Sequence, residues 1–332
     1  MMQKMRLNIL YQPTEEPWGG SNTFFRNFCR TAVQDTSVEW MDRPGSADVI
    51  LSAGHYRGPG KFLKTYELRN VQSGRSLGNP LGFLSHQKRR KILFRVDGLR
   101  KIYAEGSVPA DEILLKHLPY ADGYIFQSEF SRRCFENIPA IKQKPCTVIR
   151  NGANTDIFSP GKQTGISSKK IILISNGWST NLRKGFGTIA AFSRMSDVTV
   201  KHIGRWPDSI SSEKVECLGP KKEKEIGSIL REGHFFLFPS ENEACPNVVV
   251  EALACGLPVL YHPSGGTAEL VRFDQMGLAI PSDAGDIAQL GHFMEQALNK
   301  HSMMMKNILG SIDEFSFNRC YQKYISFMRE RQ

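Results

Sequence analysis

The sequence predicts an α/β protein made of two Rossmann-like domains that face each other across a cleft. A chain of 332 residues is too long for one typical core and suits two. Short apolar runs alternate with amphipathic stretches and turn residues, the pattern of parallel strands joined by crossover helices. This pattern is interrupted at 148–161 and then begins again. We therefore expect a first domain over 1–152 and a second over 153–314.

The apolar runs locate the expected strands. In the first domain they cover 7–11, 49–52, 91–95 and 123–127. In the second domain they cover 170–175, 198–203, 215–217, 234–239 and 258–261. Each run in the second domain precedes helical sequence, so this half is predicted to be a complete doubly wound unit. Such sheets bind ligands beyond the carboxyl ends of their strands, here in the loops that follow Ser175, Ile203, Pro239 and Tyr261.

The composition excludes several classes of protein. Hydrophobic residues make up 40% of the chain, and no stretch approaches the roughly 18 consecutive apolar residues that a membrane span requires. The N-terminal segment is expected to form the first strand and not a signal peptide. The 7 cysteines are scattered and never spaced as Cys-x-x-Cys, which predicts reduced thiols without a disulfide framework or zinc site. We therefore expect a cytoplasmic protein.

The net charge of +10 is unevenly distributed. Residues 1–152 contain 23 Lys and Arg against 14 Asp and Glu, whereas the rest contain 20 against 19. The basic half is expected to attract anions such as a phosphorylated acceptor, an anionic membrane surface or nucleic acid. Its densest basic cluster, at 86–91, is most simply interpreted as a solvated helix face.

The segment 238–259 carries the most chemical information. A strand is expected to end at Pro239, and Pro246 suits the first position of the following helix. Amides at 245–248 would then present the positive end of the helix dipole to phosphate or to a sugar hydroxyl. Glu243 precedes this helix and Glu251 lies inside it, where carboxylates can accept hydrogen bonds from vicinal hydroxyls. Alternatively, Glu251 satisfies donors of the helix or of nearby loops.

Glu243 and Glu251 form a Glu-x7-Glu motif that is followed by Glu-Ala-Leu-Ala-Cys-Gly-Leu-Pro-Val and by Ser-Gly-Gly-Thr-Ala-Glu-Leu-Val at 264–271. Together these segments strongly resemble family four of the retaining glycosyltransferases, the glycosyl transferases of group 1, whose two-Rossmann architecture is called GT-B. Three more segments resemble the family in its order along the chain, namely 17–24, 121–131 and 148–160. The resemblance implies an acceptor-side first domain and a second domain that binds a nucleotide-sugar donor. It also implies that a C-terminal helix at about 315–332 returns to the first domain, although a simple amphipathic capping helix would show the same pattern.

The resemblance also implies a donor site. Lys184 matches the family lysine that contacts the donor's diphosphate, whereas Trp178 or Ser179 occupies the usual arginine position. Arg183 or Arg205 is expected to compensate, although an exposed arginine is more often only solvated. The base is expected near the loops after Ile203 and Cys217, and UDP and GDP remain open. The expected donor-binding residues are Gly19, Gly20, Arg183, Lys184, Arg205, Gly219, Glu243, Ala244, Cys245, Pro246, Asn247, Val248 and Glu251.

Asp97 marks a second departure from the family. Many relatives place a histidine after a central strand of the first domain, where this chain has Phe-Arg-Val-Asp-Gly-Leu at 94–99. We expect Asp97 to contact the sugar or the acceptor hydroxyl, the alternative being a turn cap before Gly98. The expected catalytic residues are Glu243, Asp97 and Lys184. The departing diphosphate would be stabilised without a metal or another cofactor, and it would take the acceptor's proton.

The predicted function is retaining transfer of a sugar, of hexosyltransferase type, from a UDP- or GDP-sugar to a glycan, lipid-linked or other hydroxyl acceptor. Expected partners include the donor, the acceptor and an anionic membrane at its inner face, but no nucleic acid. The alternatives are a noncatalytic nucleotide-sugar-binding or assembly protein and a GT-B epimerase or phosphorylase. An NAD oxidoreductase is disfavoured, because the Gly-x-Gly-x-x-Ala at 185–190 begins about nine residues after its strand.

Overall fold

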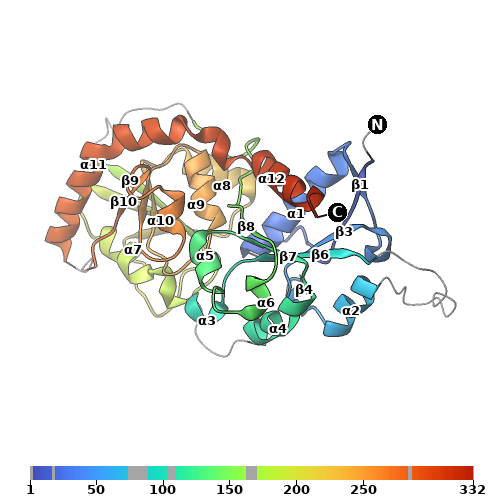
Figure 1. Ribbon diagram of the computed structural model, residues 1–332. Coiled ribbons are helices and arrows are strands. Elements are labelled where there is room, and N and C mark those ends of the chain that lie inside the picture. The colour runs from blue at the N-terminus through green and yellow to red at the C-terminus, as the bar shows by residue number, and fades with distance from the viewer. Residues whose placement is uncertain are drawn as a thin grey trace. The chain divides into compact units, whose positions relative to one another are not determined.

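The computed structural model describes residues 3–16, 19–73, 89–103, 109–161, 170–282 and 286–331. They form two compact units, which Figure 1 shows as ribbons. One unit contains the chain up to Ile102, the segment that ends at Arg150 and the chain from Cys320 onward, and the other contains Asn151–Arg319. Residues 86–88 of the basic cluster lie outside the described residues, as do Pro17 and Trp18 of the Gly-rich segment. Arg89 and Arg90 lie in coil and Lys91 begins a strand, so the interpretation of this cluster as a helix face is wrong for these three residues.

The first unit is built on a parallel sheet of six strands in the order β2-β1-β3-β6-β7-β8. Its strands are β1 (Met5–Ile9), β2 (Val38–Trp40), β3 (Val49–Ser52), β6 (Lys91–Val96), β7 (Gly123–Phe126) and β8 (Cys146–Val148). Every residue of β3 and β7 is buried, as expected for central strands that are covered on both faces. An antiparallel hairpin of β4 (Tyr56–Gly58) and β5 (Lys61–Phe62) follows β3.

Helices connect these strands. They are α1 (Gly19–Gln34), α2 (Thr65–Ser73), α3 (Arg100–Tyr103), α4 (Pro109–His117), α5 (Glu129–Arg133), α6 (Pro139–Lys142) and the C-terminal α12 (Phe317–Arg329). The unit also has the 3₁₀ helices Pro44–Ser46 and Leu118–Tyr120. α12 packs on α1, where the ring centroids of Phe28 and Tyr321 are 5.0 Å apart and the Tyr321 hydroxyl donates to Asp35 at 3.0 Å. The aromatic face of the C-terminal helix thus completes the core of the first unit.

The second unit contains another parallel sheet of six strands, in the order β11-β10-β9-β12-β13-β14. Its strands are β9 (Ile171–Gly177), β10 (Val198–Gly204), β11 (Val215–Gly219), β12 (Phe235–Phe238), β13 (Val259–Tyr261) and β14 (Gly277–Ala279). Numbered within the unit, this is the order 3-2-1-4-5-6 of doubly wound nucleotide-binding sheets. The strand order reverses between β9 and β12, and ligands of such folds bind in the crevice at this switch point.

Helices cover both faces of the second sheet. They are α7 (Phe186–Phe192), α8 (Glu223–Leu230), α9 (Asn247–Ala254), α10 (Thr267–Leu270) and α11 (Ile287–Leu309), with 3₁₀ helices at Leu182–Lys184 and Ile312–Phe315. In β12, Phe236 packs in the core that includes α9, and its neighbour Leu237 packs in the core that includes α7 and α11. Successive side chains of a strand point to opposite faces, so one buried strand serves both cores.

The predicted fold class of two Rossmann-like α/β halves is confirmed. The prediction missed β2, β14 and the β4–β5 hairpin, because their two or three residues form no apolar run that stands out from the surrounding loops. It also ended β9, β10 and β11 too early. The backbone ladder continues through Gly177 and Gly204, which pair in register although neither has a side chain to mark a strand. No helix in the described part of the chain is long and apolar enough to cross a membrane.

Candidate functional site

The switch point of the second sheet brings Lys184 and Glu243 together. Lys184 ends the 3₁₀ helix after β9, and Glu243 lies in the loop after β12. The Lys184 ammonium donates to Oε1 of Glu243, which also accepts from the Ser240 hydroxyl at 3.1 Å. The two side chains remain 28% and 19% exposed, so the ion pair is partly open to solvent. A ligand at this edge can therefore reach both charges.

Two glycines hold the loops of this pair in place. Gly185 has φ +74°, and a Cβ there would lie 2.6 Å from the carbonyl oxygen of Pro239. Gly265, also at φ +74°, would place a Cβ 2.5 Å from the carbonyl oxygen of Glu243. That oxygen accepts from the Gly266 amide at 2.7 Å. Any side chain at Gly185 or Gly265 would push the loops apart, because the obstacles are backbone atoms.

The N-terminus of α9 lies directly beyond Glu243. Pro246 is the N-cap and not the first helical residue as predicted, because its ψ of 120° is extended and the helix begins at Asn247. Ala244, Cys245 and Pro246 are buried, whereas Asn247 and Val248 are partly exposed. The first amides of a helix have no acceptor within that helix and carry its positive pole. The expected anion-binding end of α9 is thus at the same edge as Lys184.

Asn151 anchors this helix end. Its backbone amide donates to Sγ of Cys245 at 3.3 Å, and its side-chain amide donates to the Cys245 carbonyl at 2.9 Å and to Oδ1 of Asn247 at 2.7 Å. Asn151 is only 5% exposed. The Arg-Asn-Gly segment that resembles the family's interdomain segment therefore has a structural role inside the second unit, which is to fix the start of α9.

Glu251 is buried in α9, with 9% of its surface exposed. Burial raises the pKa of its carboxyl to about 8, and the charge of Glu223 at the start of α8 adds to this effect. Within the described ranges, no hydrogen bond reaches the Glu251 side chain. The interpretation that Glu251 satisfies helix or loop donors therefore finds no support. A buried carboxyl with a raised pKa and spare hydrogen-bonding capacity is a candidate for ligand contact.

Arg183, Arg205 and Gly219 follow three different strands at the same edge of the sheet. The Arg183 amide donates to Oδ1 of Asn181 at 3.0 Å, and its carbonyl accepts from the Glu241 amide at 3.0 Å, so its backbone joins the loops after β9 and β12. The Arg205 guanidinium follows β10 and is exposed. Gly219 ends β11 in a left-handed conformation, with φ +68°, and pairs in register with Ile203.

Asp97 belongs to the first unit and follows β6. Its carboxylate accepts from the Ser21 hydroxyl at 2.7 Å, from the Arg95 guanidinium at 2.5 Å and from the Gln127 side-chain amide. Arg95 has a side chain that is only 1% exposed. Asp97 therefore neutralises a buried cation, and the donors that reach it are the side chains of Ser21, Arg95 and Gln127 and not the turn at Gly98. Gly19 and Gly20, both exposed, begin α1 just before Ser21.

His55 is a candidate that sequence reasoning missed. It follows the fully buried β3, is 8% exposed, and has Nδ1 at 2.8 Å from the Ala53 carbonyl. Nδ1 therefore carries the proton, which leaves Nε2 as a hydrogen-bond acceptor. Burial lowers the pKa of His55, while the charge of Asp97 opposes this shift. The signal in the sequence that could have identified it is a histidine three residues after the predicted strand Val49–Ser52.

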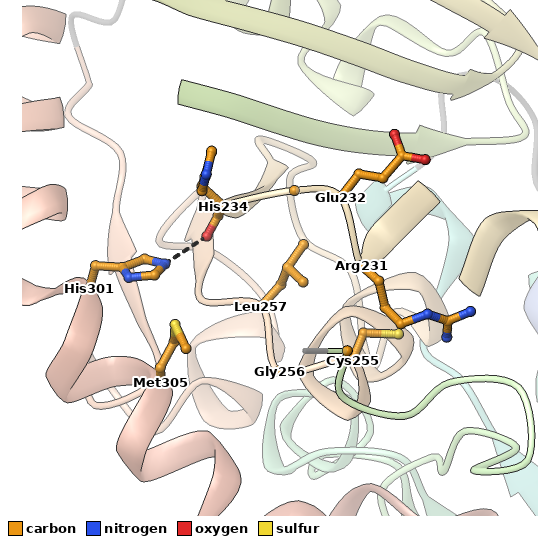
Figure 2. Close-up of a pocket in the computed structure, with 10 residues that line it drawn as sticks. Arg231, Glu232, His234, Cys255, Gly256, Leu257, His301 and Met305 are labelled. Atoms are coloured by element: carbon orange, nitrogen blue, oxygen red, sulfur yellow. Dashed lines mark hydrogen bonds between the residues drawn. The ribbon is translucent and has the colours of Figure 1, made fainter. Parts of the chain in front are cut away.

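A pocket lies at the other edge of the second sheet (Figure 2). His234 and Leu257, which line it, precede β12 and β13, so the pocket is at the amino ends of these strands. His301 donates from Nε2 to the His234 carbonyl at 3.1 Å, and Nδ1 of His234 accepts from the Ile172 amide at 2.9 Å. None of the predicted site residues lines this pocket. We therefore place the candidate site at the carboxyl edge.

Comparison with known proteins finds a family match in the second unit. Residues 187–298 match the family model described as Glycosyl transferases group 1. The D-inositol 3-phosphate glycosyltransferase of Mycobacterium sp. (strain JLS) is 24% identical over 207 residues, which are 56% of this chain and 47% of that protein. The chain thus spans about half the length of this relative. The N,N'-diacetylbacillosaminyl-diphospho-undecaprenol alpha-1,3-N-acetylgalactosaminyltransferase of Campylobacter jejuni is 22% identical over 295 residues, 80% of this chain and 78% of that protein.

Solved structures share the fold. The crystal structure of Anabaena Alr3699/HepE in complex with UDP and glucose matches with a TM-score of 0.68 and 14% identity, over 98% of this chain and 100% of the other. At this identity the likeness shows the architecture, which is the one that the family resemblance implied. The chain therefore has the GT-B fold, and residues 187–298 of its second unit match the model of the group 1 glycosyl transferases.

Proposed function

We propose that this protein transfers a sugar, with retention of configuration, from a UDP- or GDP-sugar to a hydroxyl of a glycan or lipid-linked acceptor. The observation that carries the proposal is the Lys184–Glu243 pair beside the N-terminus of α9, at the switch point between β9 and β12. This arrangement combines a cation, a helix dipole and a carboxylate. These are the groups required to hold a diphosphate next to a sugar.

In the proposed reaction the bond from the anomeric carbon to the donor phosphate breaks while the acceptor oxygen bonds from the same face. The acceptor's proton passes to the departing diphosphate, so no protein nucleophile is needed. Negative charge develops on the diphosphate, where Lys184 and the first amides of α9 stabilise it. Once Lys184 contacts phosphate, its partner Glu243 is available to accept hydrogen bonds from sugar hydroxyls. We propose that these groups act without a metal ion.

The nucleoside is proposed to lie near Glu251 and Gly219. The Glu251 carboxyl has no hydrogen-bond partner within the described ranges, and the charge of Glu223 at the start of α8 acts on it. A ribose hydroxyl would supply the missing partner. The structure of Anabaena Alr3699/HepE contains UDP and glucose, which makes uridine nucleotides the first to test.

The acceptor is proposed to carry phosphate or to be presented at an anionic membrane. The first half of the chain is strongly basic. In addition, the described part of the first unit exposes 41% of Phe62 and 52% of Tyr66, beside the exposed lysines Lys61 and Lys64. Aromatic rings flanked by cations suit a membrane interface. The names of the mycobacterial and Campylobacter relatives, an inositol phosphate and a diphospho-undecaprenol enzyme, are consistent with phosphorylated acceptors.

Vesicle sedimentation tests this acceptor proposal. The protein should bind phosphatidylglycerol-containing vesicles at 0.1 M salt and leave them at 1 M, because the Debye length falls from about 10 Å to about 3 Å. The double variant Phe62→Ser/Tyr66→Ser should bind less, with pure phosphatidylcholine vesicles as the control. Absence of binding at low salt, together with equal rates on phosphorylated and unphosphorylated acceptors, would refute it.

A donor screen tests the function itself. UDP-, GDP- and ADP-sugars are compared by thermal shift, because a ligand at 100 times its Kd adds about 2.7 kcal/mol of stability. The donor that binds is then incubated with acceptors in excess EDTA, and the anomeric configuration of the product is read by NMR. Retained configuration and activity in EDTA support the proposal. Binding without transfer or hydrolysis indicates an assembly protein, an altered free sugar without acceptor indicates an epimerase, and no binding refutes the proposal.

A further inference from the structure

Trp178 occupies the loop in which the family resemblance implies an arginine, and Arg205 follows the neighbouring strand β10. Building on the proposed function, we propose that Trp178 is a positioning residue that holds the Arg205 guanidinium for the donor's diphosphate. The arginine that Trp178 replaces in the loop after β9 is thus supplied from the loop after β10. The nucleoside diphosphate would then contact both Arg205 and Lys184.

Backbone contacts join the loop after β9 to the loop after β10. The Arg205 amide donates to the Gly177 carbonyl at 3.0 Å. Gly204 has φ +109°, and a Cβ at this position would lie 2.0 Å from the same carbonyl oxygen. Only glycine permits so close an approach. The residue before Trp178 and the residue before Arg205 are therefore in direct contact, which brings the two side chains to the same place.

His202 anchors the loop that carries Arg205. It is 1% exposed, with Nδ1 at 2.6 Å from the Ser175 hydroxyl and Nε2 at 3.2 Å from the Arg205 carbonyl. Burial lowers the pKa of His202 to about 4, so the ring is neutral at physiological pH. The carbonyl can only accept, so Nε2 donates to it, while Nδ1 accepts from Ser175. The path of the chain at Arg205 is thus set by a buried histidine on β10.

The side chains then stack. The guanidinium carbon of Arg205 lies 4.5 Å from the centroid of the Trp178 ring, within the range of a cation–π contact. In the part of the chain that the structure describes, no carboxylate forms an ion pair with Arg205, in contrast to Lys184. Its charge is therefore open to an external anion. Stacking leaves the edge of the guanidinium, with its donors, available for bidentate contact with phosphate oxygens.

Positioning has a thermodynamic consequence. A free arginine side chain must lose rotamer freedom when it binds phosphate, and an aromatic ring that already orders it reduces this cost. Removing Arg205 should therefore weaken binding of a nucleoside diphosphate by about 10- to 100-fold. Removing only the ring should weaken it by about two- to fivefold, the range of an exposed cation–π contact.

A double-mutant cycle tests the inference. Affinities for UDP, GDP and the matching nucleosides uridine and guanosine are measured by calorimetry for Arg205→Ala, Trp178→Ala, Trp178→Phe and the double alanine variant. We expect Trp178→Ala to have its effect only when Arg205 is present, Trp178→Phe to retain most of the affinity, and nucleoside binding to be unchanged throughout. Lys214→Ala, an exposed cation at the amino end of β11, is the control for loss of charge.

The outcomes separate this inference from the proposed function. If the wild-type protein binds neither diphosphate, the proposed function is wrong and the cycle has no basis. If it binds one of them, then unchanged affinity in Arg205→Ala, or equal effects of Trp178→Ala with and without Arg205, overturns the inference alone. Melting temperatures of all variants show whether any loss reflects misfolding instead.

Discussion

The carboxyl edges of the two sheets differ although both sheets have six parallel strands. At the first edge, Asp97 accepts from three side chains and neutralises the buried Arg95. At the second edge, the Lys184–Glu243 pair is partly exposed, and no described carboxylate pairs with Arg205. A polar edge is thus not evidence of a ligand site by itself. The second edge differs because its ion pair is open to solvent and because the charge of Arg205 has no carboxylate partner among the described residues.

The largest expected effect comes from Glu243→Gln, which keeps the side chain's shape but removes its charge. If the second edge acts on the sugar, turnover should fall by about 100- to 1000-fold, the range for loss of one group that stabilises a transition state. Affinity for UDP or GDP should change little, because this interaction belongs to the reacting sugar. Turnover numbers and calorimetry check both points. Glu241→Gln, in the same loop, is the control, and near-normal turnover in Glu243→Gln would remove it from the site.

Next in size is the pH dependence that Glu251 imposes on stability. The pKa of its carboxyl is about 8 in the folded protein against an ordinary value of 4.5, so between these pH values the unfolded state binds fewer protons than the folded state. The free energy of unfolding therefore falls as pH rises from about 4.5 to 8, by about 1.4 kcal/mol for each unit of pKa difference. In Glu251→Gln the free energy of unfolding should no longer fall in this way as pH rises. Urea unfolding at pH 5 and pH 8 measures the difference. The exposed Glu295→Gln is the control, and an unchanged slope in Glu251→Gln would show that Glu251 is not held protonated.

Lys184→Ala tests whether the exposed ion pair is available to a ligand. The variant should lose about 1.5 to 3 kcal/mol of binding free energy for both the nucleoside diphosphate and the sugar donor, since a charge-assisted contact to phosphate disappears. Calorimetry with UDP and GDP measures it, with Lys214→Ala as the control for net charge. Equal affinities for wild type and Lys184→Ala would mean that the pair serves only the fold, like Asp97 and Arg95.

The smallest expected effect is on the first edge. Asp97→Asn should lower the free energy of unfolding by about 1 to 2 kcal/mol, because the buried Arg95 loses its carboxylate while the surface side of the site remains solvated. Urea unfolding measures this, and Asp42→Asn at an exposed position is the control. A variant of normal stability with impaired transfer would instead support the predicted contact of Asp97 with sugar or acceptor, and would remove the contrast between the two edges.

The sequence by itself determined the α/β class, the two halves and the loops that carry the candidate site. These features depend on local patterns: apolar runs that both faces of a sheet bury, and a Glu-x7-Glu motif on a loop and the following helix. The family resemblance implied that Lys184 and Glu243 belong to one site. Elements of two or three residues such as β2 and β14 were missed, because they owe their conformation to neighbouring strands and not to their own side chains.

Only the tertiary structure decided which polar residues have partners. From the sequence, Asp97 is expected to contact the sugar or the acceptor hydroxyl or to cap the turn before Gly98, yet in the fold it accepts from the side chains of Ser21, Arg95 and Gln127. The sequence left open whether Arg205 binds the donor or is only solvated, and it did not predict that the close contact of Gly204 with Gly177 brings Arg205 onto the ring of Trp178. Apart from that of Arg95 with Asp97, these contacts join residues distant in the chain. Strand order determines them, and no local sequence pattern encodes strand order.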